Sequence, residues 1–125
     1  MEIDDDTVKL LAEIAFMAGG YKMIGPSDTI AVGLERARPD SERPHLVRAI
    51  TRLNAKDTAT AERILRDQAL KINPNSAMSK AFLGIALHMQ GRINERDQVL
   101  NEVIATDDDD EDAVKIAKDL LNGTQ

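Results

Sequence analysis

Two similar short segments, 35 residues apart, constrain the fold of this chain more than any other feature of its sequence. They are Arg38-Pro39-Asp40-Ser41 and Asn73-Pro74-Asn75-Ser76, and each places a proline and a serine directly before a helical pattern. Serine is a preferred N-cap residue, so each segment predicts the start of a helix. Turn residues follow a similar spacing at Gly19-Gly20, Lys56-Asp57 and Gly91-Arg92. The period therefore predicts stacked units of two helices each.

The apolar residues between these turns recur at helical spacing and predict three helix hairpins followed by one further helix. Aromatic residues make up only 2% of the chain, so small aliphatic side chains must fill the core, which suits closely packed helices. The last helix is apolar on one side and would close the open end of the array; this side carries Val114, Ile116, Ala117, Leu120 and Leu121. We expect one domain, residues 1–125, with helices at 6–18, 27–37, 42–55, 58–72, 76–90, 93–105 and 111–122.

The unit length and one motif resemble the tetratricopeptide repeat, whose two-helix unit has about 34 residues. The stretch 82–92 resembles the first helix and turn of that repeat, with the pair Leu83-Gly84 and a second glycine, Gly91, seven residues on. In the middle unit, Ala61 and Leu65 stand where the family places a small and a bulky residue. Ankyrin repeats have a similar length, but their Thr-Pro-Leu-His signature is absent. The resemblance implies an all-α, right-handed solenoid of three tetratricopeptide-like hairpins and a C-terminal capping helix.

The charge balance argues against several classes of function. The formal net charge is −6 and no basic stripe is present, so we expect no nucleic-acid partner. The chain has no cysteine, and no apolar run approaches the roughly 20 residues of a membrane-spanning helix. The N-terminal residues 1–6 are acidic where a secretory signal would be basic, so we expect a cytoplasmic protein without membrane insertion.

No group of residues predicts catalysis, a cofactor or a metal ion. The acidic run Asp107–Asp112 lacks the glycine and glutamate of a calcium loop, and it is better interpreted as the charged N-terminus of the last helix. The two histidines, His45 and His88, have no serine, cysteine or carboxylate partner at a spacing typical of acid–base chemistry. Gly19-Gly20 lacks the lysine of a phosphate-binding loop. The sequence therefore predicts a protein that is not an enzyme.

The first helix of each hairpin carries the candidate binding residues, because these helices line the concave surface of a tetratricopeptide array. Apolar side chains at helical spacing would form a groove for an amphipathic helix, although the same spacing fits ordinary core packing equally well. The groove would use Leu46, Ile50, Leu53, Met78, Ile85 and Met89.

The chain also resembles one branch of the repeat superfamily, the tetratricopeptide-like chaperones of bacterial type III secretion needle subunits. The resemblance rests on the segments 10–15 and 28–34, on the third unit and on the closing helix with its acidic start. It implies a cytoplasmic chaperone that binds the C-terminal amphipathic helix of the needle subunit and prevents premature polymerisation. It further implies a small helical co-chaperone on the N-terminal hairpin, at Leu10, Leu11, Ile14 and Met17.

A general tetratricopeptide adaptor is the alternative interpretation. Such a protein would bind a short peptide or a C-terminal carboxylate through lysine, arginine and asparagine side chains. The apolar character of the expected groove residues favours the chaperone. An apolar groove that holds no partner also favours self-association of the free protein.

Overall fold

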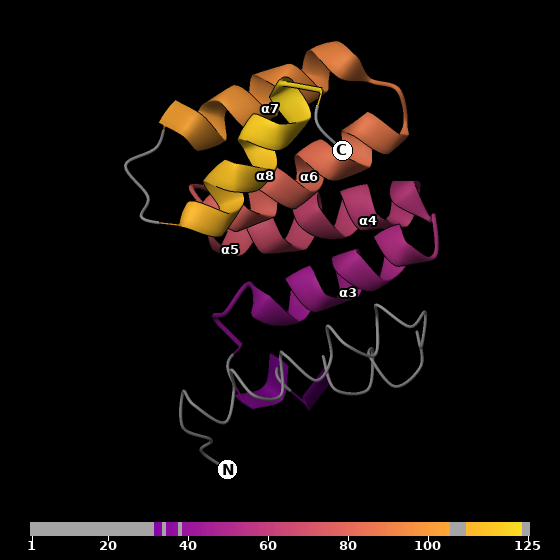
Figure 1. Ribbon diagram of the computed structural model, residues 1–125. Helices are drawn as coiled ribbons and strands as arrows, with labels where there is room; N and C mark the ends of the chain where they lie inside the picture. Colours follow the sequence, from indigo (N-terminus) through magenta and orange to yellow (C-terminus); the bar gives the residue numbers. More distant parts are fainter. Residues whose placement is uncertain (1–31, 34, 38, 106–109, 124–125) are drawn as a thin grey trace.

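The computed structural model describes residues 32–33, 35–37, 39–105 and 110–123, and all its assigned elements are helices (Figure 1). The predicted helix at 6–18 lies outside the described residues, as does most of the predicted helix at 27–37. The helices are α3 (Arg43–Asn54), α4 (Thr58–Ile64), the π-helical segment η1 (Leu65–Ala69), α5 (Leu70–Ile72), α6 (Ala77–Met89), α7 (Ile93–Ala105) and α8 (Glu111–Leu121).

Short side chains accept hydrogen bonds at the helix starts. The predicted N-cap role is confirmed for Ser76, whereas the N-cap of α3 is Glu42, one residue after Ser41. The Ser41 hydroxyl accepts a hydrogen bond from the backbone N–H of residue 43, and Ser76 accepts one from that of residue 79. Asp57 begins α4 in the same way, and Asp110 begins α8. These oxygens satisfy backbone N–H groups that have no partner in the first turn of a helix.

Two residues with positive φ separate the helices of the two complete hairpins. Lys56 has a φ of 63° between α3 and α4, and Gly91 has a φ of 75° between α6 and α7. This left-handed conformation ends a helix and reverses the chain, so both predicted turns are confirmed. The next helix then packs back on the one before it: α3 on α4, and α6 on α7 (Figure 1).

The second helix of the middle unit is longer than its counterpart α7 and contains a π-helical turn. The first helices of successive units nevertheless begin at equal intervals, because α3, α6 and α8 start at residues 43, 77 and 111. Segments α4, η1 and α5 follow one another without a break over 58–72, and the N–H of Leu70 donates to the carbonyl of Leu65, five residues back. A π turn holds one residue more than an α turn, so it accommodates part of the extra length of this helix.

In the described part of the chain, buried aliphatic side chains form two core clusters, and α6 contributes to both. On one side, Leu83 and Leu87 pack with residues of α3 and of the helix at 58–72. On the other side, Ala77 and Ala81 pack with α7 and α8. The helix α6 is therefore the central element, and α8 covers the end of the array as predicted, with Val114, Ile116, Leu120 and Leu121 packed around the buried Ala113 and Ala117.

A glycine lets α7 approach α6 closely. Gly84 lies in the middle of α6, opposite the fully buried Leu100 of α7. A β-carbon at Gly84 would meet Cδ2 of Leu100 and lie only 2.9 Å from its Cγ. The glycine of the Leu83-Gly84 pair, which resembles the repeat motif, therefore has a packing role.

The side chain of Glu42 joins the start of the middle unit to the start of the third unit. The Ser79 hydroxyl, buried at the start of α6, donates to Glu42 Oε2 at 2.5 Å, and the Asn73 side-chain amide donates to the other oxygen of the same carboxylate at 3.3 Å. Glu42 immediately precedes α3, so this carboxylate links the starts of two successive first helices.

Candidate functional site

An apolar stripe runs along α6 and is the candidate binding surface. It consists of Met78, Phe82, Ile85 and Met89, whose spacing of four, three and four residues places them on one face of the helix. The first three are half-buried, and Met89 is 44% exposed. The stripe therefore combines packing against the core with apolar surface that is open to solvent.

The predicted groove residues of α6, which are Met78, Ile85 and Met89, all belong to this stripe. On α3, Ile50 is half-buried. Leu46 and Leu53 are only 5% and 7% exposed, and both are members of the core cluster that includes residues of α4 and α6. Their side chains therefore stabilise the fold and are not presented to a partner in this structure, although helical spacing alone places them with Ile50.

The residues predicted to contact a co-chaperone, Leu10, Leu11, Ile14 and Met17, lie outside the described residues. Their role stays a prediction.

Sequence reasoning did not identify Phe82 as a candidate binding residue. It completes the stripe between Met78 and Ile85, and the same four-and-three spacing indicates it in the sequence. It is half-buried and packs against the cluster that contains Leu83 and Leu87. A partner on this surface would therefore meet one aromatic and three aliphatic side chains.

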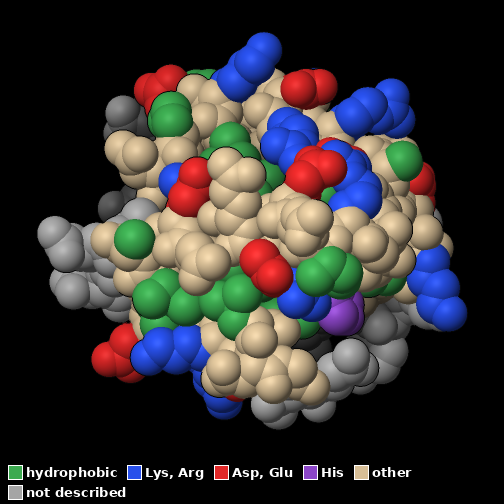
Figure 2. All heavy atoms as spheres, turned by 90° about the horizontal axis from the view of Figure 1, so that it is seen from above, with side chains coloured by type: hydrophobic (Ala, Val, Ile, Leu, Met, Phe, Trp, Pro, Cys, Tyr) green, Lys and Arg blue, Asp and Glu red, His purple; other side chains and the backbone are tan. Residues whose placement is uncertain are grey.

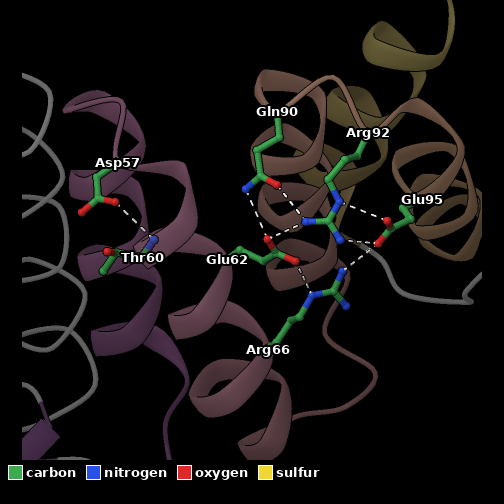
Figure 3. Close-up of polar contacts among 7 residues, drawn as sticks. All are labelled: Asp57, Thr60, Glu62, Arg66, Gln90, Arg92 and Glu95. Carbon is green, nitrogen blue, oxygen red and sulfur yellow. Dashed lines mark hydrogen bonds and ion pairs between the residues drawn. The ribbon is translucent and has the colours of Figure 1, made fainter.

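A network of charged and amide side chains joins the helix at 58–72 to the turn between α6 and α7 (Figure 3). Its centre is Glu62 of α4, which accepts hydrogen bonds from Arg66 at 2.9 Å, Gln90 at 3.2 Å and Arg92 at 2.8 Å. Arg92 also donates two hydrogen bonds to Glu95, at 3.0 and 2.6 Å. Oppositely charged side chains lie next to one another at one corner of the face in Figure 2, and hydrophobic side chains form a strip across its middle.

This network keeps its carboxylates charged. Burial alone raises the pKa of Glu62, but the hydrogen bonds from Arg66, Gln90 and Arg92 outweigh it and leave the pKa below its ordinary value of 4.5. The hydrogen bonds from Arg92 lower the pKa of Glu95, and those same bonds raise the pKa of Arg92. The arrangement is that of a structural ion-pair network, since each of its carboxylates accepts hydrogen bonds from arginine side chains.

The two histidines have partners that do not suit acid–base catalysis. His45 Nδ1 lies 2.9 Å from the side-chain oxygen of Gln68, and His88 Nδ1 lies 2.8 Å from a terminal nitrogen of Arg96. The Arg96 guanidinium can only donate, so Nδ1 of His88 is the acceptor. Within the described ranges, no group of three or more histidine, aspartate or glutamate side chains could hold a metal ion.

None of the helices in the described part of the chain is long and apolar enough to cross a membrane.

Comparison with known proteins identifies the fold. No protein-family model matches the sequence, and no curated protein matches it significantly. Among solved structures, the chain is similar to the first TPR of Spaghetti (RPAP3) bound to the HSP90 peptide SRMEEVD, with a TM-score of 0.73 and 15% sequence identity over 97% of this chain and 98% of that one. The chain therefore has the all-α fold of a tetratricopeptide-repeat domain, as its sequence predicts.

Proposed function

We propose that this chain is a peptide-binding adaptor without catalytic activity, which holds a segment of another protein on the apolar stripe of α6. The observation that carries the proposal is the apolar stripe Met78, Phe82, Ile85 and Met89, which leaves large hydrophobic side chains partly open to solvent. The similar structure holds a peptide of a partner protein on the same fold, which supports binding of this general kind.

The chemistry of the stripe distinguishes the proposed segment from the peptide in that neighbour. The peptide SRMEEVD contains two glutamates and an aspartate, and an acidic peptide of this kind needs cations for recognition. The stripe on α6 contains no charged residue. We therefore propose a segment whose own apolar side chains recur at helical spacing, which is the usual complement of an apolar helix face.

The export chaperone is the more specific form of this proposal. The segment would then be the amphipathic helix of a secretion needle subunit, covered in the bacterial cytoplasm until export, and a co-chaperone would contact the N-terminal hairpin. The apolar character of the stripe favours this form, because a subunit that polymerises through apolar surfaces needs those surfaces covered. The identity of the bound protein decides between the general adaptor and the export chaperone.

A pair of matched variants tests the adaptor proposal. Met89 on the stripe and Ile104 on α7 are similarly exposed, at 44% and 40%, so Met89→Asp and Ile104→Asp remove comparable apolar surface at different places. We expect Met89→Asp to weaken partner binding at least about tenfold, because an unpaired carboxylate is costly in an apolar contact. Ile104→Asp should leave binding unchanged, and both variants should keep the helicity of the parent protein.

The measurement is affinity purification of the tagged parent and both variants from native cells, with the recovered proteins identified by mass spectrometry. A small helical subunit, recovered in about equal amount with the parent and Ile104→Asp but lost with Met89→Asp, supports the export chaperone. Larger proteins that share a short segment, with the same dependence on Met89, support the general adaptor. If both variants lose the partner protein equally, or if neither variant loses it, the stripe is not the binding surface.

A further inference from the structure

A pocket of about 240 Å³ opens between the helix at 58–72, α6 and α7. Its apolar lining comes from Leu70, Leu83 and Val99, and its polar lining from Arg66, Lys80, Glu95, Gln98 and Glu102. Lys80 is two residues from Met78 and from Phe82, and each residue turns an α-helix by about 100°. The pocket and the apolar stripe therefore lie on opposite sides of α6.

The charges around the pocket are divided by sign between its walls. Glu95 and Glu102 both belong to α7, two helical turns apart, whereas Arg66 belongs to η1 and Lys80 to α6. The closest approaches across the pocket are 3.6 Å from Arg66 to Glu95 and 3.7 Å from Lys80 to Glu102. Both distances exceed the roughly 2.7–3.2 Å of a hydrogen bond, so these pairs attract each other without bonding directly. Figure 3 shows the first pair.

Lys80, on the basic wall, has donors available to a ligand. The side chain of Lys80 is only 16% exposed, yet within the described part of the chain its ammonium group makes no hydrogen bond, and its long contact with Glu102 is its closest ionic approach. An ammonium group has three donors, and none of those of Lys80 is taken by a protein acceptor among the described residues. A carboxylate or carbonyl oxygen placed in the pocket would satisfy them.

The size of the pocket restricts what can occupy it. Sites for cofactors and drug-sized molecules usually occupy about 300–1,000 Å³, so a pocket of about 240 Å³ is too small for these and suits one large apolar side chain. The wall on α7 presents Glu95, Val99 and Glu102 at helical spacing, which is the geometry into which the side chains of a second helix pack.

We propose that this pocket is a second binding site, separate from the stripe, for a helical segment of a partner protein. One leucine- or phenylalanine-sized side chain of that segment enters the pocket against Leu70, Leu83 and Val99. An acidic side chain beside it bonds to Lys80 or Arg66. A basic side chain on its other flank faces the glutamates of α7. The site does not depend on the function proposed for the stripe.

A designed peptide tests this proposal on the full chain. The probe is a blocked helical peptide of alanines with one central phenylalanine, two glutamates along one side of it and two lysines along the other. Nuclear magnetic resonance spectra of the isotope-labelled protein are recorded during titration. We expect saturable shifts centred on the methyl groups of Leu70, Leu83 and Val99. A peptide with serine in place of its phenylalanine should produce none, and a peptide with glutamine in place of all four charged residues should bind about tenfold more weakly.

Variants of the protein complete the test. Lys80→Met keeps the aliphatic stem but removes the charge, and Glu102→Gln removes one acid from the α7 wall; each should weaken binding of the charged peptide by about tenfold. Lys118→Met, an exposed position on α8 outside the pocket, is the matched control and should have no effect. Absence of saturable shifts, or shifts centred on Met78 and Ile85 of the stripe instead, would overturn the proposal.

Discussion

The close approach of α6 and α7 gives a sharp test of the fold, through the variant Gly84→Ala. The new methyl group would meet Cδ2 of Leu100 and lie 2.9 Å from its Cγ, so one of the two side chains must move. Leu100 is 0% exposed and belongs to the cluster that α6 shares with α7 and α8. It has little room to move, so the strain should be shared with the helix backbones.

Two opposing effects set the size of the change. Overfilling a packed core costs about 1–3 kcal/mol, whereas replacing glycine by alanine within a helix stabilises it by about 1 kcal/mol. The first effect should win here, and we expect Gly84→Ala to lower the free energy of unfolding by about 1 kcal/mol. In a chain of this size, that lowers the Tm by about 3–6 °C.

Urea denaturation followed by far-ultraviolet circular dichroism measures this change, and two further variants make it specific. Gly33→Ala is the matched control, because Gly33 is helical and a β-carbon there would meet no atom of the described residues within 4 Å, so this variant should be neutral or slightly stabilising. In a Leu100→Ala background, Gly84→Ala should no longer destabilise, because its methyl group enters the vacated space. A destabilisation of the same size in both backgrounds, or a stabilisation of the parent protein, would refute the close packing of α6 on α7.

Two further predictions concern the polar contacts. Glu62→Gln should lower the free energy of unfolding near neutral pH by about 1 kcal/mol, because charge-assisted bonds from Arg66 and Arg92 are lost. Folding lowers the pKa of Glu62, so the contribution of this carboxylate to stability is complete above the unfolded pKa of 4.5 and disappears as the pH falls through the folded pKa. The free energies of unfolding of parent and variant should therefore converge in acid. A difference in free energy that stays constant with pH would contradict this. In a double-mutant cycle, Glu42→Ala and Ser79→Ala should show a coupling of about 1–2 kcal/mol, and additive effects would argue against their hydrogen bond.

Helix positions in the described chain follow from the sequence to within a residue or two. The predicted helices at 42–55, 58–72, 76–90, 93–105 and 111–122 correspond to the observed ones, because each has a local signal at its boundary. Ser76 begins a helix through its own hydroxyl, and Gly91 ends one through its backbone conformation. Such signals depend on a few neighbouring residues and can be read without knowledge of the tertiary structure.

The candidate site was less predictable, because burial depends on contacts between distant segments. Ile50 and Leu53 fit the same helical pattern, yet only Leu53 is covered by the core. The contact between Glu42 and Ser79 joins residues 37 positions apart, and no local pattern indicates it. Periodicity specifies which side chains share a face, but the neighbouring helices decide which face is exposed.

The π turn at Leu65–Ala69 affects how the sequence of such an array can change in evolution. In an uninterrupted α-helix, one inserted residue rotates everything that follows by about 100°, which would turn Ala69 out of the core and misalign the next unit. A local π turn accommodates one more residue than an α turn, and α3, α6 and α8 still begin at equal intervals, at residues 43, 77 and 111. A residue inserted into the second helix of a unit can therefore be accommodated within that helix, and the helices that follow keep their orientation.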